Sequence, residues 1–407
     1  MKATPTNSGY AGIDWSWQHH ALCIVDDDGQ RIEEATLPHT RPGLAKITTL
    51  LRRHGVDRVG IERGDGPVVE HLIRDGFEVV VISARQVKSL RARYCSAGNK
   101  DDRFDAFVLA DALRTDAGRW AIVRPDSDET IALRMLVRAR QDLIGHRIAV
   151  HNQLLAVLQH NFPGAIGLFS QLDNTISLAF LRRFPTEAKA AWLSEVRMGH
   201  WLKANSYCGR HTPTRLVEHL HDAASGRVTG PAAEASELIV LTLLDLLTNL
   251  REDQSALEAR IEEALLAHPD GPIFASLPRA GTVRAATLLA EIGDCRARFP
   301  DPAALAAAAG VAPSTRQSGK HLNVAYRRGC NKQLRHALID WAQDTPRANA
   351  WARDTYDRAR ARGCRHPHAA RILAQGWTRI LWRCWHQHQP YNPDLHGRLN
   401  TLQQEAA

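Results

Sequence analysis

Short apolar runs alternate with amphipathic segments over the first 125 residues. Apolar runs bounded by turn residues predict strands at 9–16, on either side of Asp28-Gly29 within 20–37, at 56–62 and at 77–83. Apolar positions at helical spacing predict helices at 43–53, 67–76, 84–94 and 102–115. Three leading strands that can form a meander, followed by strands separated by helices, predict a mixed sheet with helices on its faces.

Two later segments, 128–160 and 232–267, have long helical periodicity. In the second, leucines close to heptad spacing are separated by charged residues; they are Leu243, Leu246, Leu250 and Leu257. The two helices could therefore pair as a coiled coil, within one chain or between subunits. The stretch between them, 163–230, is punctuated by Pro and Gly and predicts several short helices, without a chemical signature.

The C-terminal third is predicted to be mainly helical. A turn-rich start at 275 leads into a short helix, and 371–386 forms an amphipathic helix whose apolar face carries Trp377 and Leu381. We therefore expect an α/β domain at 1–125, a helical coiled-coil linker with an insertion at 126–270, a mainly α domain at 271–390 and a tail at 391–407.

Composition is that of a soluble globular protein, with 407 residues, 44% hydrophobic and 24% charged. No apolar run approaches the roughly 18 to 20 residues that span a bilayer, and the N-terminus lacks an apolar signal core. Seven scattered cysteines, none in a Cys-x-x-Cys pair, argue against a disulfide framework. We expect a protein of the reducing cytoplasm with no membrane partner.

The net charge is +8, mostly through arginine. Arginine forms forked contacts with phosphate, so this excess is typical of a protein with a polyanionic partner. A general surface excess of arginine explains the charge equally well, and charge alone does not separate the two.

Four acidic residues stand out because of their places in the predicted elements. Asp14 ends the first strand, Glu62 ends a later strand, and Asp102 and Asp105 share one face of a helix. Each one alone is readily explained as a cap, a turn residue or a solvated charge. Together they indicate a cation site, because carboxylates gathered at strand ends repel one another unless a cation holds them. Oxygen ligands alone suit Mg²⁺, which supports phosphoryl transfer.

A second candidate site lies at 304–338. An alanine-rich helix reaches Gly310, and a predicted turn then carries Ser314, Thr315 and Ser318. A basic run accompanies it, comprising Arg316, Lys320, Arg327, Arg328, Lys332 and Arg335. A serine before a glycine among cations suits contact with phosphate, and cations stabilise an attacking alkoxide. No His/Asp pair is linked to this serine, and on the residues alone a turn serine beside a DNA-binding or surface arginine cluster remains open.

Residues 10–115 resemble the RuvC-like, RNase H-fold domain of DEDD transposases. The motifs G-I-D, I-E and K-x-D-x-x-D-A match at Asp14, Glu62, Asp102 and Asp105. Asp101 departs from the small polar residue that the family usually has there, and it could compete as a ligand; we favour Asp102. Asp111 lies nearby but off the face that the pair shares.

The motifs A-G-V-A-P, R-Q-S-G and R-R-G-x-N-K-x-L-R resemble the C-terminal domain of the same family, the bridge-RNA-guided insertion-sequence recombinases. The resemblance covers most of 9–160 and 232–388 and assigns the nucleophile to Ser318, with Ser314 as the alternative. Upstream, S-L-P-R-A-G-T-V-R resembles a helix-hairpin-helix, whose turn amides can hold a phosphate.

The resemblance implies a transposase that breaks and exchanges DNA strands through a covalent phosphoserine at Ser318. Mg²⁺ would be held by the four carboxylates, and the basic run would contact nucleic acid. The implied partners are donor and target duplex DNA, a structured guide RNA and further copies of the chain, from a dimer to a tetramer, in a bacterial cytoplasm. Two rivals stay open: a metal-only nuclease or junction resolvase in which water attacks, and a non-catalytic nucleic-acid-binding protein.

Overall fold

The computed structural model describes residues 9–94, 101–120, 122–225, 229–319 and 321–396. The chain divides into two units, Met1–Pro125 and Asp126–Ala407, each with its own core. We describe each unit by itself. In the parts of the chain that the structure describes, no helix is long and apolar enough to cross a membrane.

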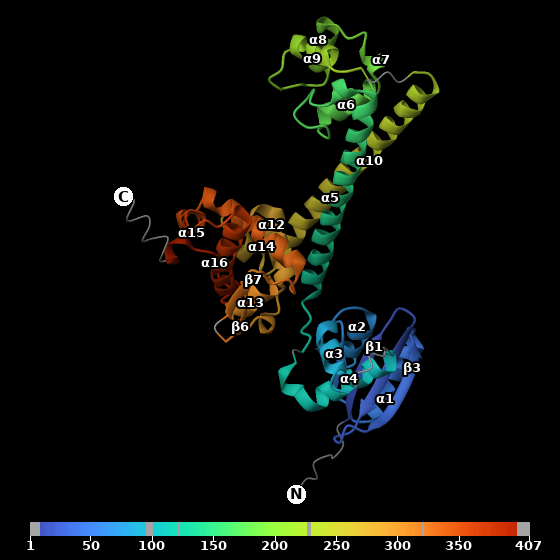
Figure 1. The fold of residues 1–407 in the computed structure, drawn as a ribbon, viewed down its shortest axis with the longest axis vertical. Helices are drawn as coiled ribbons and strands as arrows, with labels where there is room; N and C mark the ends of the chain where they lie inside the picture. Colours follow the sequence, from blue (N-terminus) through green and yellow to red (C-terminus); the bar gives the residue numbers. More distant parts are fainter. Residues whose placement is uncertain (1–8, 95–100, 121, 226–228, 320, 397–407) are drawn as a thin grey trace. The chain divides into compact units, whose positions relative to one another are not determined.

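The first unit contains a five-stranded mixed sheet, as the hydrophobic pattern predicts (Figure 1). Its strands are β1 (Tyr10–Trp15), β2 (His19–Val25), β3 (Arg31–Pro38), β4 (Arg58–Ile61) and β5 (Glu78–Val81), in the spatial order β3-β2-β1-β4-β5. The first three form an antiparallel meander, and β4 and β5 add in parallel beyond β1. The predicted turn at Asp28-Gly29 joins β2 to β3, with Gly29 at a φ of 82°.

Helices cover both faces of this sheet. They are α1 (Arg41–Arg53), α2 (Pro67–Arg74), α3 (Ala84–Arg91) and α4 (Asp102–Asp116). One face packs Ile13 and Val59 against residues of α1 and α2 such as Ile47 and Leu72. On the opposite face, Val80 packs with residues of α3 and α4. The alternation of side chains along a strand assigns each strand residue to one of these two faces.

The second unit is built on a pair of long helices, α5 (Asp128–Asn161) and α10 (Pro231–Ala267) (Figure 1). They run antiparallel, because Thr130 meets His268 at one end, at 2.8 Å, and Asn161 meets Ser236 at the other, at 2.6 Å. The helical pairing is therefore confirmed, whereas coiled-coil geometry remains a prediction.

One residue of the predicted heptad is not buried within the chain. Leu246 is 45% exposed, and its neighbour Leu247 is buried in its place. Val240, Leu247 and Ile261 are all buried and lie at multiples of seven residues, so the seam includes Leu247. The sequence pattern could not separate two adjacent leucines.

Between the long helices, the chain forms the predicted short helices: α6 (Thr175–Arg183), α7 (Glu187–Ala190), α8 (Glu195–Ala204) and α9 (Pro213–Asp222). Their apolar side chains share a separate core with the adjoining ends of α5 and α10, including Leu158, Phe180, Met198 and Leu244. This insertion is thus a small helical bundle with its own packing.

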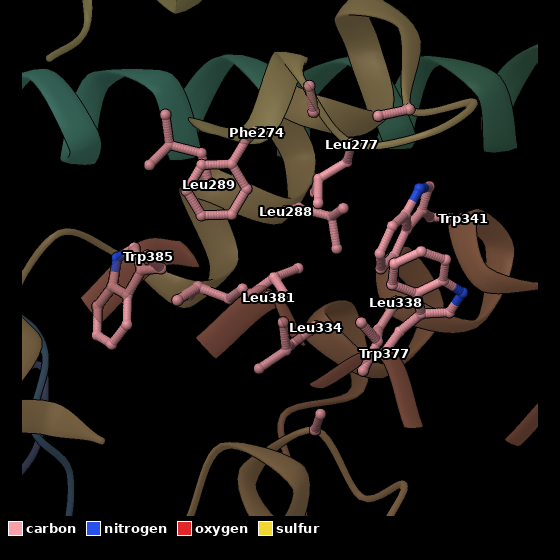
Figure 2. Packing of buried hydrophobic residues seen from close by; sticks show 14 of the residues in the cluster. Phe274, Leu277, Leu288, Leu289, Leu334, Leu338, Trp341, Trp377, Leu381 and Trp385 are labelled. Carbon is pink, nitrogen blue, oxygen red and sulfur yellow. The ribbon is translucent and has the colours of Figure 1, made fainter. Parts of the chain in front are cut away.

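The rest of the second unit packs around buried tryptophans. Its helices are α11 (Gly271–Ala275), α12 (Gly281–Ile292), α13 (Pro302–Ala308), α14 (Lys332–Asp344), α15 (Ala350–Ala361) and α16 (His366–His386). Trp341, Trp377 and Trp385 are fully buried among leucines from α12, α14 and α16 (Figure 2). Each indole N–H donates to an oxygen, as for Trp385 to the carbonyl of Gly293 at 2.9 Å. The predicted helix at 371–386 is confirmed but begins earlier, at His366.

The segment predicted as a serine-bearing turn forms a hairpin of β6 (Ser314–Ser318) and β7 (His321–Ala325). That prediction was wrong in its local structure. Ser318 pairs with His321 across a two-residue connection, and Gly319 there has a φ of 56°. A glycine in a two-residue connection is a hairpin signal, but the polar character of the flanking residues concealed the strands.

Candidate active site

Asp14 and Glu62 lie side by side at one edge of the sheet. The parallel ladder between β1 and β4 pairs Gly12 with Gly60 and Ile13 with Ile61, so Asp14 and Glu62 come next in register. Both glycines face α4, since a side chain at either would meet the α4 backbone. Side chains alternate along a strand, so Asp14 and Glu62, two residues further on, point to the same face.

The two glycines let α4 approach the sheet closely. A Cβ at Gly12 would overlap the carbonyl oxygen of Ala106, and one at Gly60 would lie 3.0 Å from that of Leu109. Glycine within a strand commonly marks such an approach of another backbone segment. The glycines of the motifs G-I-D and V-G-I-E are therefore part of the site's construction.

The direction of α4 brings its acidic first turn to the same edge. Near its C-terminal end, Arg114 donates to the carbonyl of Asp27, in the β2–β3 turn beside the start of β1. Near its N-terminal end, Ala106 packs with Ala21, the strand partner of Asp14. Consequently α4 runs antiparallel to β1, and Asp102 and Asp105 begin the helix at the edge that holds Asp14 and Glu62.

Asp105 already has a cationic partner. Its carboxylate is 2% exposed, and both of its oxygens accept hydrogen bonds from the Arg91 guanidinium at the end of α3. This ion pair could not be predicted from the sequence pattern, because Arg91 and Asp105 belong to different helices. Asp102 is exposed, one helical turn before Asp105.

The neighbouring acids have structural roles. Asp101 accepts a hydrogen bond from the Arg103 amide at 3.2 Å, which is the contact of a helix-capping residue. Asp111 is buried and accepts bonds from Tyr94 and Arg114. Burial, with the bond to Asp111, raises the pKa of Tyr94 to about 12, so the phenol stays protonated. Asp101 and Asp111 thus have partners of their own, as Asp105 does, and the choice of Asp102 over Asp101 remains a prediction.

The donor set suits a hard divalent cation, because all four predicted ligands offer carboxylate oxygens. Within the ranges described above, no three or more acidic, histidine or cysteine residues are close enough together to hold a metal ion. The four carboxylates thus share an edge without forming a closed ligand set. The bonds to Arg91 occupy part of the acceptor capacity that Asp105 would offer to such a cation.

Ser318 is exposed at the tip of the β6–β7 hairpin, and Ser314 is at its base. Arg316, Arg328 and Lys332 are exposed, and Arg327 is half-buried. Lys320, which was also predicted to bind nucleic acid, lies outside the described residues. The structure therefore presents Ser318 to solvent with exposed cations along the same segment.

Arg335 differs from the other predicted nucleic-acid ligands. It is 7% exposed, and its guanidinium donates to the Tyr326 hydroxyl and to the Arg327 carbonyl. It also lies 4.3 Å from the centroid of the Tyr326 ring, and a Cβ at Gly310 would overlap it. In this structure Arg335 is thus a packing residue that joins two of the C-terminal motifs; charge counting could not reveal its burial.

The predicted helix-hairpin-helix corresponds to α11, a turn and α12. Arg279, with a φ of 61°, and Gly281, with a φ of 58°, form the turn. Arg279 and Arg284 both bond to Asp344 of α14, which fixes the turn against that helix. The turn opens onto a cavity of about 630 Å³ between α5, α12 and α14.

Two family models match separate regions of this chain. A family model for DEDD transposases of the IS110 type matches residues 11–163, which include all four carboxylates. A second one, described as the transposase IS116/IS110/IS902 family, matches residues 271–357, which include Ser318. The fold and the two matched regions define a DNA-cleaving transposase with a RuvC-like N-terminal domain, a class that implies divalent-metal use.

Relatives match along nearly the whole chain. A protein assigned as the mini-circle transposase for IS117 in Streptomyces coelicolor is 31% identical over 94% of this chain and 95% of its own length. The 43.6 kDa protein of insertion element IS110 in the same organism is 29% identical over 92% and 93%. The 42 kDa protein of insertion element IS900 in Mycobacterium paratuberculosis is 26% identical over 94% and 97%. The chain belongs to the IS110/IS116 family of insertion-sequence transposases.

Proposed function

We propose that this transposase exchanges strands between donor and target DNA through a phosphoserine intermediate at Ser318, with Mg²⁺ held by Asp14, Glu62, Asp102 and Asp105. The observation that carries the proposal is the shared sheet edge. The register of β1 and β4 supports it for Asp14 and Glu62, and the close approach and direction of α4 support it for Asp102 and Asp105.

In the first step, the Ser318 oxygen forms a bond to a DNA phosphorus, and the bond from that phosphorus to one bridging oxygen breaks. The serine proton ends on the departing oxygen, which becomes the free hydroxyl of the broken strand. A hydroxyl from a partner strand then attacks the phosphoserine, restores the phosphodiester and returns the proton to Ser318. The number of phosphodiester bonds is conserved, so no external energy source is needed.

The residues around Ser318 act by binding and positioning. Arg316, Lys320, Arg327, Arg328 and Lys332 would contact backbone phosphates, which fixes the register of the DNA. Arg335 would act differently, by holding the loop that follows the hairpin through Tyr326. Mg²⁺, when bound at the sheet edge, would neutralise phosphate charge and stabilise the attacking and departing oxygens.

We further propose that the chain acts as a homo-oligomer, from a dimer to a tetramer, in the bacterial cytoplasm. Guidance by a structured bridge RNA follows from the resemblance of the C-terminal motifs to the RNA-guided recombinases. The protein would then recognise the backbone and the shape of the duplexes, and base pairing would select the sequence.

The proposal is tested by denaturing electrophoresis after the full chain is incubated with the element's RNA, labelled DNA and Mg²⁺. We expect a denaturation-resistant protein–DNA adduct that is lost in Ser318→Ala and kept in the matched control Ser314→Ala. Cleavage should also be lost in Asp102→Asn and on chelation of Mg²⁺. Cleavage without any adduct would instead identify a metal-only nuclease, in which water attacks.

A further inference from the structure

Several arginines of the second unit are paired with carboxylates. Arg134 and Arg298 bond to Asp126, Arg138 to Glu291, Arg296 to Asp270, and Arg279, Arg284 and Arg347 to Asp344. These arginines are committed to internal contacts. Only arginines outside such pairs have their full charge available to a polyanion.

The turn between α15 and α16 holds arginines of that second kind. Arg362 and Arg365 are exposed, and neither forms an ion pair with any residue that the structure describes. With His368 and Arg371 they line a hollow of about 430 Å³. The lining residues include three arginines and a histidine but, in the described part of the chain, no carboxylate. We call this feature the α15–α16 hollow.

The α15–α16 hollow lies against the segment that carries Ser318. The Arg371 guanidinium is 4.7 Å from the centroid of the Tyr326 ring, which Arg335 also contacts. Tyr326 directly follows β7 at the base of the hairpin, where Ala325 pairs with Ser314. A single side chain, that of Arg371, therefore belongs both to the hollow and to the hairpin base.

The length of the hairpin separates the nucleophile at its tip from its base, which Arg371 adjoins through Tyr326. Ser318 is at the hairpin tip, four residues along β6 from Ser314 at the base. At about 3.4 Å per residue, tip and base are roughly 14 Å apart. Phosphates of one DNA strand follow one another at about 3.4 Å along the helix axis, so this length corresponds to about four nucleotides.

We propose that the α15–α16 hollow binds the sugar–phosphate backbone of the DNA duplex that Ser318 attacks, about four or more nucleotides from the attacked phosphate. Arg362 and Arg365 supply forked donors to phosphate oxygens, and Arg371 connects this contact to the hairpin. The position along the DNA rests on the proposed function, whereas binding itself does not. The hollow lies beyond residues 271–357, the C-terminal region matched by the family comparison.

The test uses the full chain with Ser318→Ala, so that covalent capture cannot contribute. Binding to a fluorescein-labelled DNA duplex spanning an insertion junction is measured by anisotropy over a series of salt concentrations. We expect Arg362→Ala/Arg365→Ala to weaken binding about tenfold or more. The slope of log K against log salt should fall by roughly two, one for each lost phosphate contact.

The matched control is Arg379→Ala/Arg383→Ala, which removes two exposed charges from α16, the helix that follows the turn, at positions outside the hollow. We expect it to change affinity and slope far less. Arg362→Lys/Arg365→Lys should restore most of the slope, which a folding defect would not allow. The proposal would be overturned if the two double variants lost equal DNA affinity, or if Arg362→Ala/Arg365→Ala lost none. Loss of binding only to a matched structured RNA would overturn it as well.

A second measurement tests the position on DNA. Neutral methylphosphonates are placed one at a time on either side of the attacked phosphate. We expect one placed about four or more nucleotides away to weaken binding of the parent chain but not of the double variant. Uniform effects along the duplex would refute the placement. If Ser318 forms no adduct while the salt slope still responds to Arg362 and Arg365, the hollow stands and the proposed chemistry fails.

Discussion

Replacing Arg91 by glutamine tests the electrostatics of the carboxylate edge. Asp105 is 2% exposed, and its bonds to Arg91 are the only ones that the described structure gives its side chain. Removing one member of a buried ion pair typically costs about 3–5 kcal/mol. Arg91 itself is 25% exposed, which lets water replace part of the contact, so we expect about 3 kcal/mol.

Hydrogen exchange, measured by mass spectrometry on the full chain, reports this loss of stability locally in peptides from α3 and α4. Arg91→Gln should increase exchange there, and Arg91→Gln/Asp105→Asn should recover much of the protection because no buried charge is left unpaired. Arg93→Gln, a nearby exposed arginine, is the matched control. Added Mg²⁺ should protect Arg91→Gln more than the parent, because Asp105 is then free to join the cation. If Arg91→Gln lost less than about 0.5 kcal/mol of stability, the result would refute a buried ion pair, because surface substitutions cost this little.

Three further predictions concern stability. Gly12→Ala should destabilise the first unit by about 3 kcal/mol or more in denaturant unfolding, because its Cβ would overlap the backbone of α4; an unchanged midpoint would contradict that packing. Burial, aided by His39, lowers the pKa of His20 to about 4, so the unfolded state binds the extra proton between about pH 6.5 and 4. The free energy of unfolding should therefore be at its full value above pH 6.5 and should fall by about 1–3 kcal/mol as the pH decreases to 4. His20→Gln should remove this part of the pH dependence. Arg335→Ala should increase hydrogen exchange in the β6–β7 hairpin, whereas Arg328→Ala, an exposed neighbour, should not.

The hydrophobic pattern predicted the order of elements in the first unit because β1, β2, β4 and β5 are short runs of largely buried residues. The strand β3 is mostly exposed, and the turn at Asp28-Gly29 predicted it. It also placed Asp14 and Glu62 at strand ends, and the parallel register of β1 and β4 explains why they are neighbours. The close approach of α4 could not be predicted, although its cause, Gly12 and Gly60, is visible in the motifs.

The remaining differences between the sequence-based predictions and the structure have two kinds of physical cause. The β6–β7 hairpin is exposed on most of its described positions, so it lacks the alternation of buried and exposed residues that identifies a strand. The pairing of Arg91 with Asp105 and the burial of Arg335 are tertiary contacts of charged residues, which have no sequence period. Composition predicts that such charges exist, but not which of them are neutralised internally.

Stereochemistry at phosphorus tests the central claim most directly. A junction DNA with one chiral phosphorothioate at the attacked position is carried through complete strand exchange, and the configuration of the product is determined. Two successive in-line displacements, first by Ser318 and then by a strand hydroxyl, predict overall retention. Overall inversion would mean a single displacement by a strand hydroxyl or water, and would contradict a phosphoserine intermediate.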